Sequence, residues 1–302
     1  MTDDPGAGGG DLRVLDAHQH AWDPRRFPYP WLAAHPALDR SFSPADLDPG
    51  GVALAGRVLV EADCRPDQAA AETRWLLDLA RADPTVMGVV AAVPLERGAE
   101  VGRRIEELAA EPLVVGVRRL LQDEPAGFAL GAGFVAGTRL VAAAGLVSDL
   151  CVREWQLAEV TKLVRACPEV TFVLDHLGKP AVAARPAEPW VSDLAMLAEL
   201  PNVTVKLSGL ATEAPPGTPL QHCLPYVRHA VDRFSPERCL FGGDWPVSTL
   251  ATTYRAWYRT VHAAVADLDP AQRAGIMAGN ARRVYALPDP LPDPSTAAET
   301  AC

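Results

Sequence analysis

The sequence predicts an α/β protein that folds as one (β/α)8 barrel, and three observations lead to this prediction. Short apolar runs rich in β-branched residues recur along the chain, as expected for parallel strands that are covered on both faces. Amphipathic stretches of helical length separate these runs. The chain has 302 residues, of which 49% are apolar, and a barrel of this kind takes about 250 residues.

Eight runs are the candidate strands. They cover residues 12–18, 56–62, 86–93, 113–120, 145–152, 170–178, 203–209 and 238–246. Helical spacing is clearest over 66–82 and 153–168. The alternation of strand and helix indicates a single-domain, TIM-like barrel over residues 11–287. The rival fold, a doubly wound open sheet, would more naturally carry a phosphate-binding fingerprint after its first strand, and none is present there.

Both ends of the chain differ in composition from the barrel. Residues 1–10 are rich in glycine and aspartate, and residues 288–302 are rich in proline and poor in apolar side chains. These compositions are typical of disordered tails. We therefore expect a disordered tail at each end and no linker between them.

Composition and charge exclude several classes of partner. The formal net charge is −10, and the sequence has no block of basic residues, so a nucleic-acid partner is not expected. No apolar run approaches the length of a membrane span, and residues 1–11 lack the basic and apolar regions of a signal peptide. The six cysteines form no CxxC pair, which argues against a disulfide framework. The expectation is a reduced, cytoplasmic protein.

The stretch "LDAHQHAWDP" (15–24) places His18 and His20 at the end of the first predicted strand. Residues two apart on a strand point to the same side, so both imidazoles can bind one metal ion, at about 2.0–2.1 Å for zinc. A lone HxH is more often only a polar strand end. Here His176 ends the sixth run and Asp244 ends the eighth, and barrels place their active sites at these carboxyl ends. The four residues therefore predict a functional site.

Five motifs in this order resemble the amidohydrolase superfamily. They are "DAHQHAWDP", "FVLDHLGKP", "VKLSGL", "LFGGDWPV" and "GNARRVYAL", and the resemblance spans residues 12 to 287. The chain is most similar to the amidohydrolase-related branch, which contains sugar lactonases acting on L-fuconolactone and L-rhamnonolactone and the hydrolase of 2-pyrone-4,6-dicarboxylate. One departure is Gly243, which stands where the family usually has serine and removes a hydroxyl beside Asp244.

The resemblance also indicates how many metal ions to expect. Members with two metals use a lysine at the end of the fourth strand and a histidine after the fifth. Here the fourth run carries Arg118 and Arg119 near its end, and the fifth run ends without histidine. A site with two ions is therefore disfavoured. The prediction is one divalent ion, with zinc as the first choice, held by His18, His20, His176 and Asp244; the family also includes members that work without metal.

The resemblance implies hydrolytic opening of a sugar-derived lactone. Asp244 would take a proton from water and return it to the leaving oxygen. The ester carbonyl would be polarised by the metal ion or, without metal, by hydrogen bonds from the histidines. Asp244 and His176 are therefore the predicted catalytic residues in either version.

Four further residues are candidate substrate contacts. Arg118 could donate to the substrate or pair with Asp123 or Glu124. Lys206 could contact the substrate or form a buried pair with an acid such as Glu61. Indole rings stack on sugars, which makes Trp31 and Trp245 candidates, whereas Trp22 is expected to pack beneath the loops.

Asp175 is expected to point away from its neighbour His176 and to have a structural role. Residues 23–51, which include Trp31, are a candidate wall or lid of the pocket.

Two other functions remain open at this level. Metal-dependent decarboxylases of aromatic acids share this barrel and a similar set of ligands, and a non-catalytic barrel could bind a ligand only. A serine hydrolase is disfavoured because no GxSxG motif occurs. The sequence does not indicate which lactone is bound or what the oligomeric state is.

Overall fold

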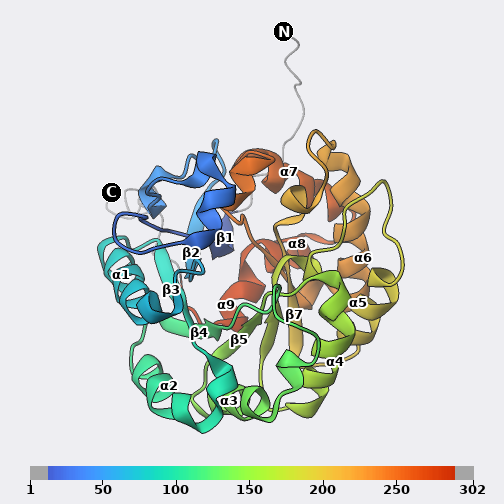
Figure 1. Ribbon diagram of the computed structural model, residues 1–302. Helices are drawn as coiled ribbons and strands as arrows, with labels where there is room; N and C mark the ends of the chain where they lie inside the picture. Colours follow the sequence, from blue (N-terminus) through green and yellow to red (C-terminus); the bar gives the residue numbers. More distant parts are fainter. Residues whose placement is uncertain (1–12, 290–302) are drawn as a thin grey trace, which may run out of the picture.

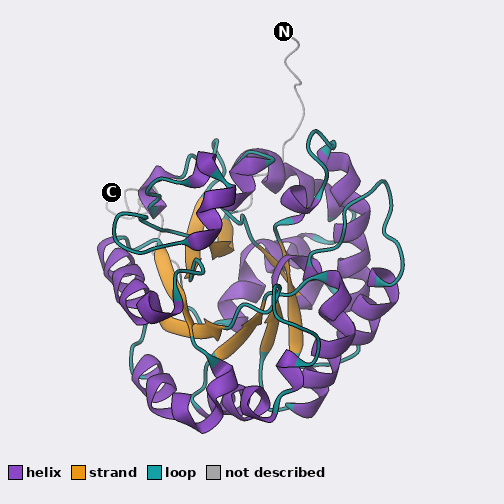
Figure 2. Ribbon diagram, viewed as in Figure 1, coloured by secondary structure: helices purple, strands orange, loops and turns teal. Residues whose placement is uncertain are grey.

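The computed structural model describes residues 13–289 and shows eight parallel strands in the order β1 to β8. The predicted N-terminal tail (1–10) and residues 290–302 of the predicted C-terminal tail lie outside the described residues. Figures 1 and 2 show the strands surrounded by helices, as in a TIM-like barrel. The strands are β1 (Val14–Gln19), β2 (Leu54–Val60), β3 (Val86–Ala92), β4 (Val114–Arg118), β5 (Val147–Leu150), β6 (Phe172–Leu174), β7 (Val203–Leu207) and β8 (Cys239–Phe241). Each predicted run overlaps one strand, and the predicted fold is confirmed.

The helices lie outside the strands and cover them with apolar faces. They are α1 (Ala69–Ala82), α2 (Gly102–Ala109), α3 (Ala132–Ala143), α4 (Leu157–Ala166), α5 (Trp190–Ala198), α6 (Leu224–Phe234), α7 (Tyr254–Ala264), α8 (Pro270–Ala274) and α9 (Asn280–Val284). In α4 the buried residues Leu157, Val160, Thr161 and Val164 recur at helical spacing. Both clearly predicted helices are present, although each begins a few residues later than the run that predicted it.

The barrel has its own inner core, separate from the layer between strands and helices. Leu15, Val58, Val90, Val173 and Leu240 pack together inside the ring of strands. The last helix, α9, and the residues after it add Ala281, Tyr285 and Leu287 to this cluster. This apolar filling leaves polar chemistry to the other end of the barrel, where the strands finish.

The barrel closes where β8 returns to β1. A bridge joins Gln19 to Trp245, and the backbone N–H groups of Asp244 and His20 donate to the carbonyls of His18 and Trp245, each at 2.8 Å. The closure therefore brings two predicted site segments together. In the part of the chain that the structure describes, no helix is both long and apolar enough to cross a membrane.

Candidate active site

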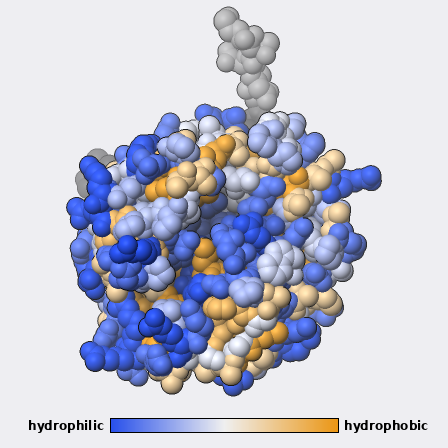
Figure 3. Space-filling view, in the orientation of Figure 1, coloured by the Kyte–Doolittle hydropathy of each residue, from blue (hydrophilic) through white to orange (hydrophobic). Residues whose placement is uncertain are grey.

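A cavity of about 300 Å³ opens at the carboxyl ends of the strands. Its wall includes His20, His176 and Asp244, together with Trp31 from the segment between β1 and β2. The space-filling view shows a hollow near the middle of this face (Figure 3). The four predicted metal ligands thus lie at or just below the floor of one cavity, at the end of the barrel where active sites are expected.

The HxH pair converges as the strand periodicity predicts. His18 and His20 are both buried, and their Nε2 atoms are 3.1 Å apart. His20 Nδ1 lies 2.9 Å from the carbonyl oxygen of Val60, on the neighbouring strand β2. We assign the proton of His20 to Nδ1, since a carbonyl can only accept, and its Nε2 then carries a lone pair toward the cavity.

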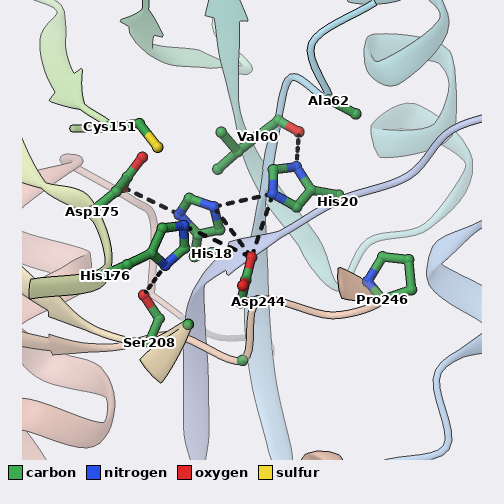
Figure 4. A network of polar contacts seen from close by, with 12 residues as sticks. His18, His20, Val60, Ala62, Cys151, Asp175, His176, Ser208, Asp244 and Pro246 are labelled. Carbon is green, nitrogen blue, oxygen red and sulfur yellow. Dashed lines mark hydrogen bonds and ion pairs between the residues drawn. The ribbon is translucent and has the colours of Figure 1, made fainter. Parts of the chain in front are cut away.

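Asp244 lies at the centre of the histidines (Figure 4). Its Oδ1 atom is 3.8 Å from His18 Nε2, 3.6 Å from His20 Nε2 and 3.8 Å from His176 Nε2. The backbone of Asp244 is left-handed, with φ of 52°, and this conformation is uncommon for a residue other than glycine. The turn after β8 therefore holds the carboxylate in a conformation that ordinary strand geometry would not provide.

His176 reaches the same place from an irregular turn after β6. Residues His176 to Lys179 all have positive φ, at 53°, 55°, 72° and 49°. His176 Nδ1 lies 2.8 Å from the hydroxyl of Ser208, which follows β7. This contact orients the ring so that Nε2 points toward Asp244.

The donor atoms fit a divalent cation. His18 Nδ1 faces the carboxylate of Asp175 at 3.2 Å, so we place its proton there as well. With these tautomers two Nε2 lone pairs face each other at 3.1 Å beside a carboxylate, an arrangement that a bound cation would stabilise. Donors about 2.1 Å from one ion in a tetrahedral arrangement would be about 3.4 Å apart. The observed separations among His18, His20 and Asp244 run from 3.1 to 3.8 Å and are close to this value.

The four candidate metal ligands do not all lie equally close to one another. Atoms of His18, His20 and Asp244 lie within 4.8 Å of one another. His176 is not part of that group, although it forms a second group with His18 and Asp175. Asp175 is already engaged by cations, so the first group is the better metal site. His176 adds a donor on another side of Asp244.

The site electrostatics also suit a cation. Burial lowers the pKa of His176 to about 4 and lowers that of His18 well below its usual value, so both rings are neutral near pH 7. Burial alone would raise the pKa of Asp244, but His176, His20 and His18 together hold it below its usual range. Neutral imidazoles beside an ionised carboxylate are the forms that bind metal.

A buried charge network lies beneath the cavity and corrects three predictions. Asp175 points inward, not away, because it continues the alternation of β6, in which Val173 also points into the barrel. The left-handed backbone at His176 then turns that residue to the same side. Asp175 contacts His18, Arg118 and Lys206.

The ion-pair partners of Arg118 are Glu61 and Asp175, at 2.6 and 3.1 Å, rather than the expected Asp123 or Glu124. Arg118 lines the cavity, but three of its five N–H donors bond to Glu61 and Asp175. Its position therefore favours a role in holding the network over direct binding of substrate.

Lys206 is fully buried and pairs with Asp149 and Asp175 rather than with Glu61. It is not among the residues of the cavity wall, so the expected substrate contact is not supported. Its ammonium lies 3.1 Å from His18 Nδ1, which places it behind the metal ligands.

The tryptophans have separate roles. Trp31 lines the cavity and donates from Nε1 to the carbonyl of Ala62 at 2.9 Å. Trp22 also borders the cavity, but it is fully buried and packs against Trp31 and Phe42. Trp245 packs edge-on against Phe42 outside the cavity wall; its contribution is the carbonyl that receives the N–H of His20.

Several site residues were missed by the sequence reasoning. Lys179, Gln122 and Glu213 line the cavity, Ser208 orients His176, and Asp149 pairs with Lys206. Lys179 follows His176 within "DHLGKP", and Ser208 lies in "VKLSGL". Their presence in the two quoted motifs was the available signal. Gln122 lies in the loop after β4 and Glu213 ends a short helix after β7, and neither stands in a recognisable sequence motif.

The side chains around Gly243 leave no room for the serine that stands at this position in the resembled motif. A Cβ atom there would lie 2.3 Å from Tyr254 Cε2 and 2.6 Å from Asp16 Oδ2. The ring of Tyr254 thus occupies the space beside the turn, while Asp16 Oδ1 accepts the N–H of Gly243 at 2.8 Å.

Gly243→Ser is expected to destabilise the protein by about 1–3 kcal/mol through overpacking. Chemical denaturation would measure this loss. Combined with Tyr254→Ala, the serine should cost less than it does alone, because the clash is removed. An undiminished stability in the single variant would show that the loop accommodates the added atoms.

Comparison with known proteins gives a consistent family. The amidohydrolase family model matches residues 15–287. The chain is 36% identical to an L-fucono-1,5-lactonase of Burkholderia multivorans over 93% of this chain and 98% of that protein. It is 33% identical to an L-fucono-1,5-lactonase of Burkholderia ambifaria, over 92% and 97% of the two chains.

A solved structure agrees with these relatives. An amidohydrolase from Burkholderia multivorans with bound zinc superimposes with a TM-score of 0.80 at 34% identity, over 91% of this chain and all of that one. The chain belongs to the amidohydrolase family. Within that family the two Burkholderia relatives are sugar lactonases, and the family match confirms the resemblance drawn from the motifs.

Proposed function

We propose that this protein hydrolyses a sugar-derived lactone, an aldonolactone, at the cluster of His18, His20, His176 and Asp244. The observation that carries the proposal is the placement of three imidazole Nε2 atoms 3.6 to 3.8 Å from one carboxylate oxygen beside the cavity. The names of the two Burkholderia lactonases support this substrate class. We further propose that it acts in carbohydrate metabolism in the cytoplasm.

Asp244 has the properties of the general base. It is ionised near pH 7 and lines the cavity, so it can take a proton from a water molecule that attacks the ester carbonyl. The same carboxyl then returns the proton to the ring oxygen as the acyl–oxygen bond breaks. His176, whose ring is oriented by Ser208, would hold Asp244 and the attacking water in position.

One divalent ion, with zinc as our first choice, would be held by His18, His20 and Asp244, with His176 as the further donor. When bound, it supplies a Lewis acid for the ester carbonyl. Asp175 and the carbonyl of Val60 hold the two strand histidines in the tautomer that ligation requires. Trp31 would offer its ring to the apolar face of the sugar.

A panel of aldono-1,5- and aldono-1,4-lactones, with acid release followed by a pH indicator, tests the proposal. We expect turnover of at least one lactone. The metal content of the same preparation should be close to one divalent ion per chain.

Removal of the metal by a chelator is expected to lower the rate at least about 100-fold, and adding back one ion per chain should restore it. Full activity in metal-free protein would instead assign polarisation of the carbonyl to the histidines.

Decarboxylation is the second candidate reaction, and the similarity to lactonases does not favour it. Release of carbon dioxide from an aromatic acid, with no acid release from any lactone, would overturn the proposal. Binding of lactones without turnover would instead indicate the non-catalytic barrel.

A further inference from the structure

Lys179 is a cation on the cavity wall that the mechanism above does not use. It is the last residue of the left-handed turn after β6, and its side chain is 17% exposed. Its Nζ donates to Gln122 Oε1 at 2.5 Å. The nearest carboxylate, Glu213, has its Oε1 atom 3.9 Å away, beyond hydrogen-bond distance. An ammonium has three donors, so Lys179 has donors to spare for a bound molecule.

The other two cations of the wall are differently placed. Arg118 directs three of its five N–H donors to Glu61 and Asp175 and forms ion pairs with both carboxylates. Arg153 pairs with Asp123 where its side chain is 44% exposed, so water screens it. Lys179 is therefore the cation of the described cavity wall that is covered from solvent and makes no ion pair within hydrogen-bond distance.

Glu213 is the complementary acceptor. It ends the short helix Leu210–Glu213 after β7 and lines the same cavity, with its side chain 22% exposed. A donor and an acceptor 3.9 Å apart, not bonded to each other, can each bind one of two neighbouring hydroxyl groups, since a hydroxyl both donates and accepts. The carboxylate of Glu213 would repel a lactone that carries an acid group in the same place.

We propose that Lys179 and Glu213 are specificity-determining residues that together recognise two adjacent hydroxyl groups of the lactone ring. Lys179, held by Gln122, donates to one hydroxyl, and Glu213 accepts from its neighbour. This inference rests on the proposed lactonase activity. It adds that the enzyme selects polyhydroxylated rings over bare or acidic lactones at a place separate from the reacting carbonyl.

The test compares a polyhydroxylated aldono-1,5-lactone with δ-valerolactone, which has the same ring and no hydroxyl group. For Lys179→Met and Glu213→Gln, we expect kcat/KM on the hydroxylated lactone to fall about 10- to 100-fold. On δ-valerolactone it should change less than about threefold, and the metal content should not change. Lys162→Met, an exposed lysine on α4, is the matched control and should leave both rates unchanged.

An equal loss on both lactones would overturn the inference, because it would show general damage to the site. No loss on the hydroxylated lactone would overturn it as well. If the parent opens no lactone, or opens δ-valerolactone too slowly to time, binding of a 1,5-anhydroalditol decides the matter. The inference predicts binding to the parent that weakens about 10-fold or more in Lys179→Met, and absent or equal binding contradicts it. Failure to open any lactone would count against the proposed function alone.

Discussion

Replacement of Asp244 by asparagine is expected to lower kcat/KM on the best aldonolactone by about 1000-fold or more. The amide keeps the size of the side chain but cannot take a proton from water. It also removes the negative charge that faces three imidazole Nε2 atoms at 3.6 to 3.8 Å, so the bound metal should decrease too. Acid release and metal content on the same preparation would measure both effects.

Asp78→Asn is a matched control for this variant. Asp78 lies on α1 and its side chain is 73% exposed, so the same chemical change there should alter the rate less than about twofold. A thermal melt would show that both variants are folded. Parental activity in Asp244→Asn would exclude the mechanism proposed for this site.

Lys206→Met is expected to destabilise the protein by about 3–5 kcal/mol. The Lys206 ammonium lies between Asp149 Oδ2, at 2.5 Å, and Asp175 Oδ1, at 3.0 Å, and all three side chains are fully buried. Methionine fills most of the space but leaves one positive charge too few for the carboxylates. Chemical denaturation of the variant and of Lys162→Met would measure the loss, which should be within about 0.5 kcal/mol in the control.

The loss should also depend on pH. Burial raises the pKa of Asp149 to about 6 even with Lys206 beside it, and removing the ammonium raises it further. Because the pKa of Asp149 is then higher in the folded than in the unfolded protein, protonation of this carboxyl favours the folded state. The variant should therefore recover stability as pH falls from about 8 to about 5. A loss below about 1 kcal/mol, unchanged with pH, would show that the network is not an essential support.

The strands and the first ligands were predictable because they depend on local pattern. Continuous apolar runs follow from burial on both faces of parallel strands. His18 and His20 share a side because strand residues alternate. His176 and Asp244 were placed at the same rim because parallel strands end at the same edge of the barrel.

The remaining site depends on contacts between distant segments. Asp175 was predicted on the wrong side because alternation was counted from His176, where positive φ breaks the rule, and not from the inward-facing Val173. The partners of Lys206 come from β5 and from the turn after β6, and nothing in a strand's own sequence indicates which neighbouring carboxylate will face it. The same holds for Gln122 and Glu213, which reach the cavity from the segments after β4 and β7, whose shape the surrounding barrel determines.

Hydrolysis of the best lactone in water enriched in heavy oxygen most directly tests whether water attacks the carbonyl at this site. Mass spectrometry of the product should find one heavy oxygen in the new carboxylate and none in the released hydroxyl. The labelled product should form at the parental rate only when Asp244 is present. Heavy oxygen in the released hydroxyl, or product formed equally fast by Asp244→Asn, would contradict the account.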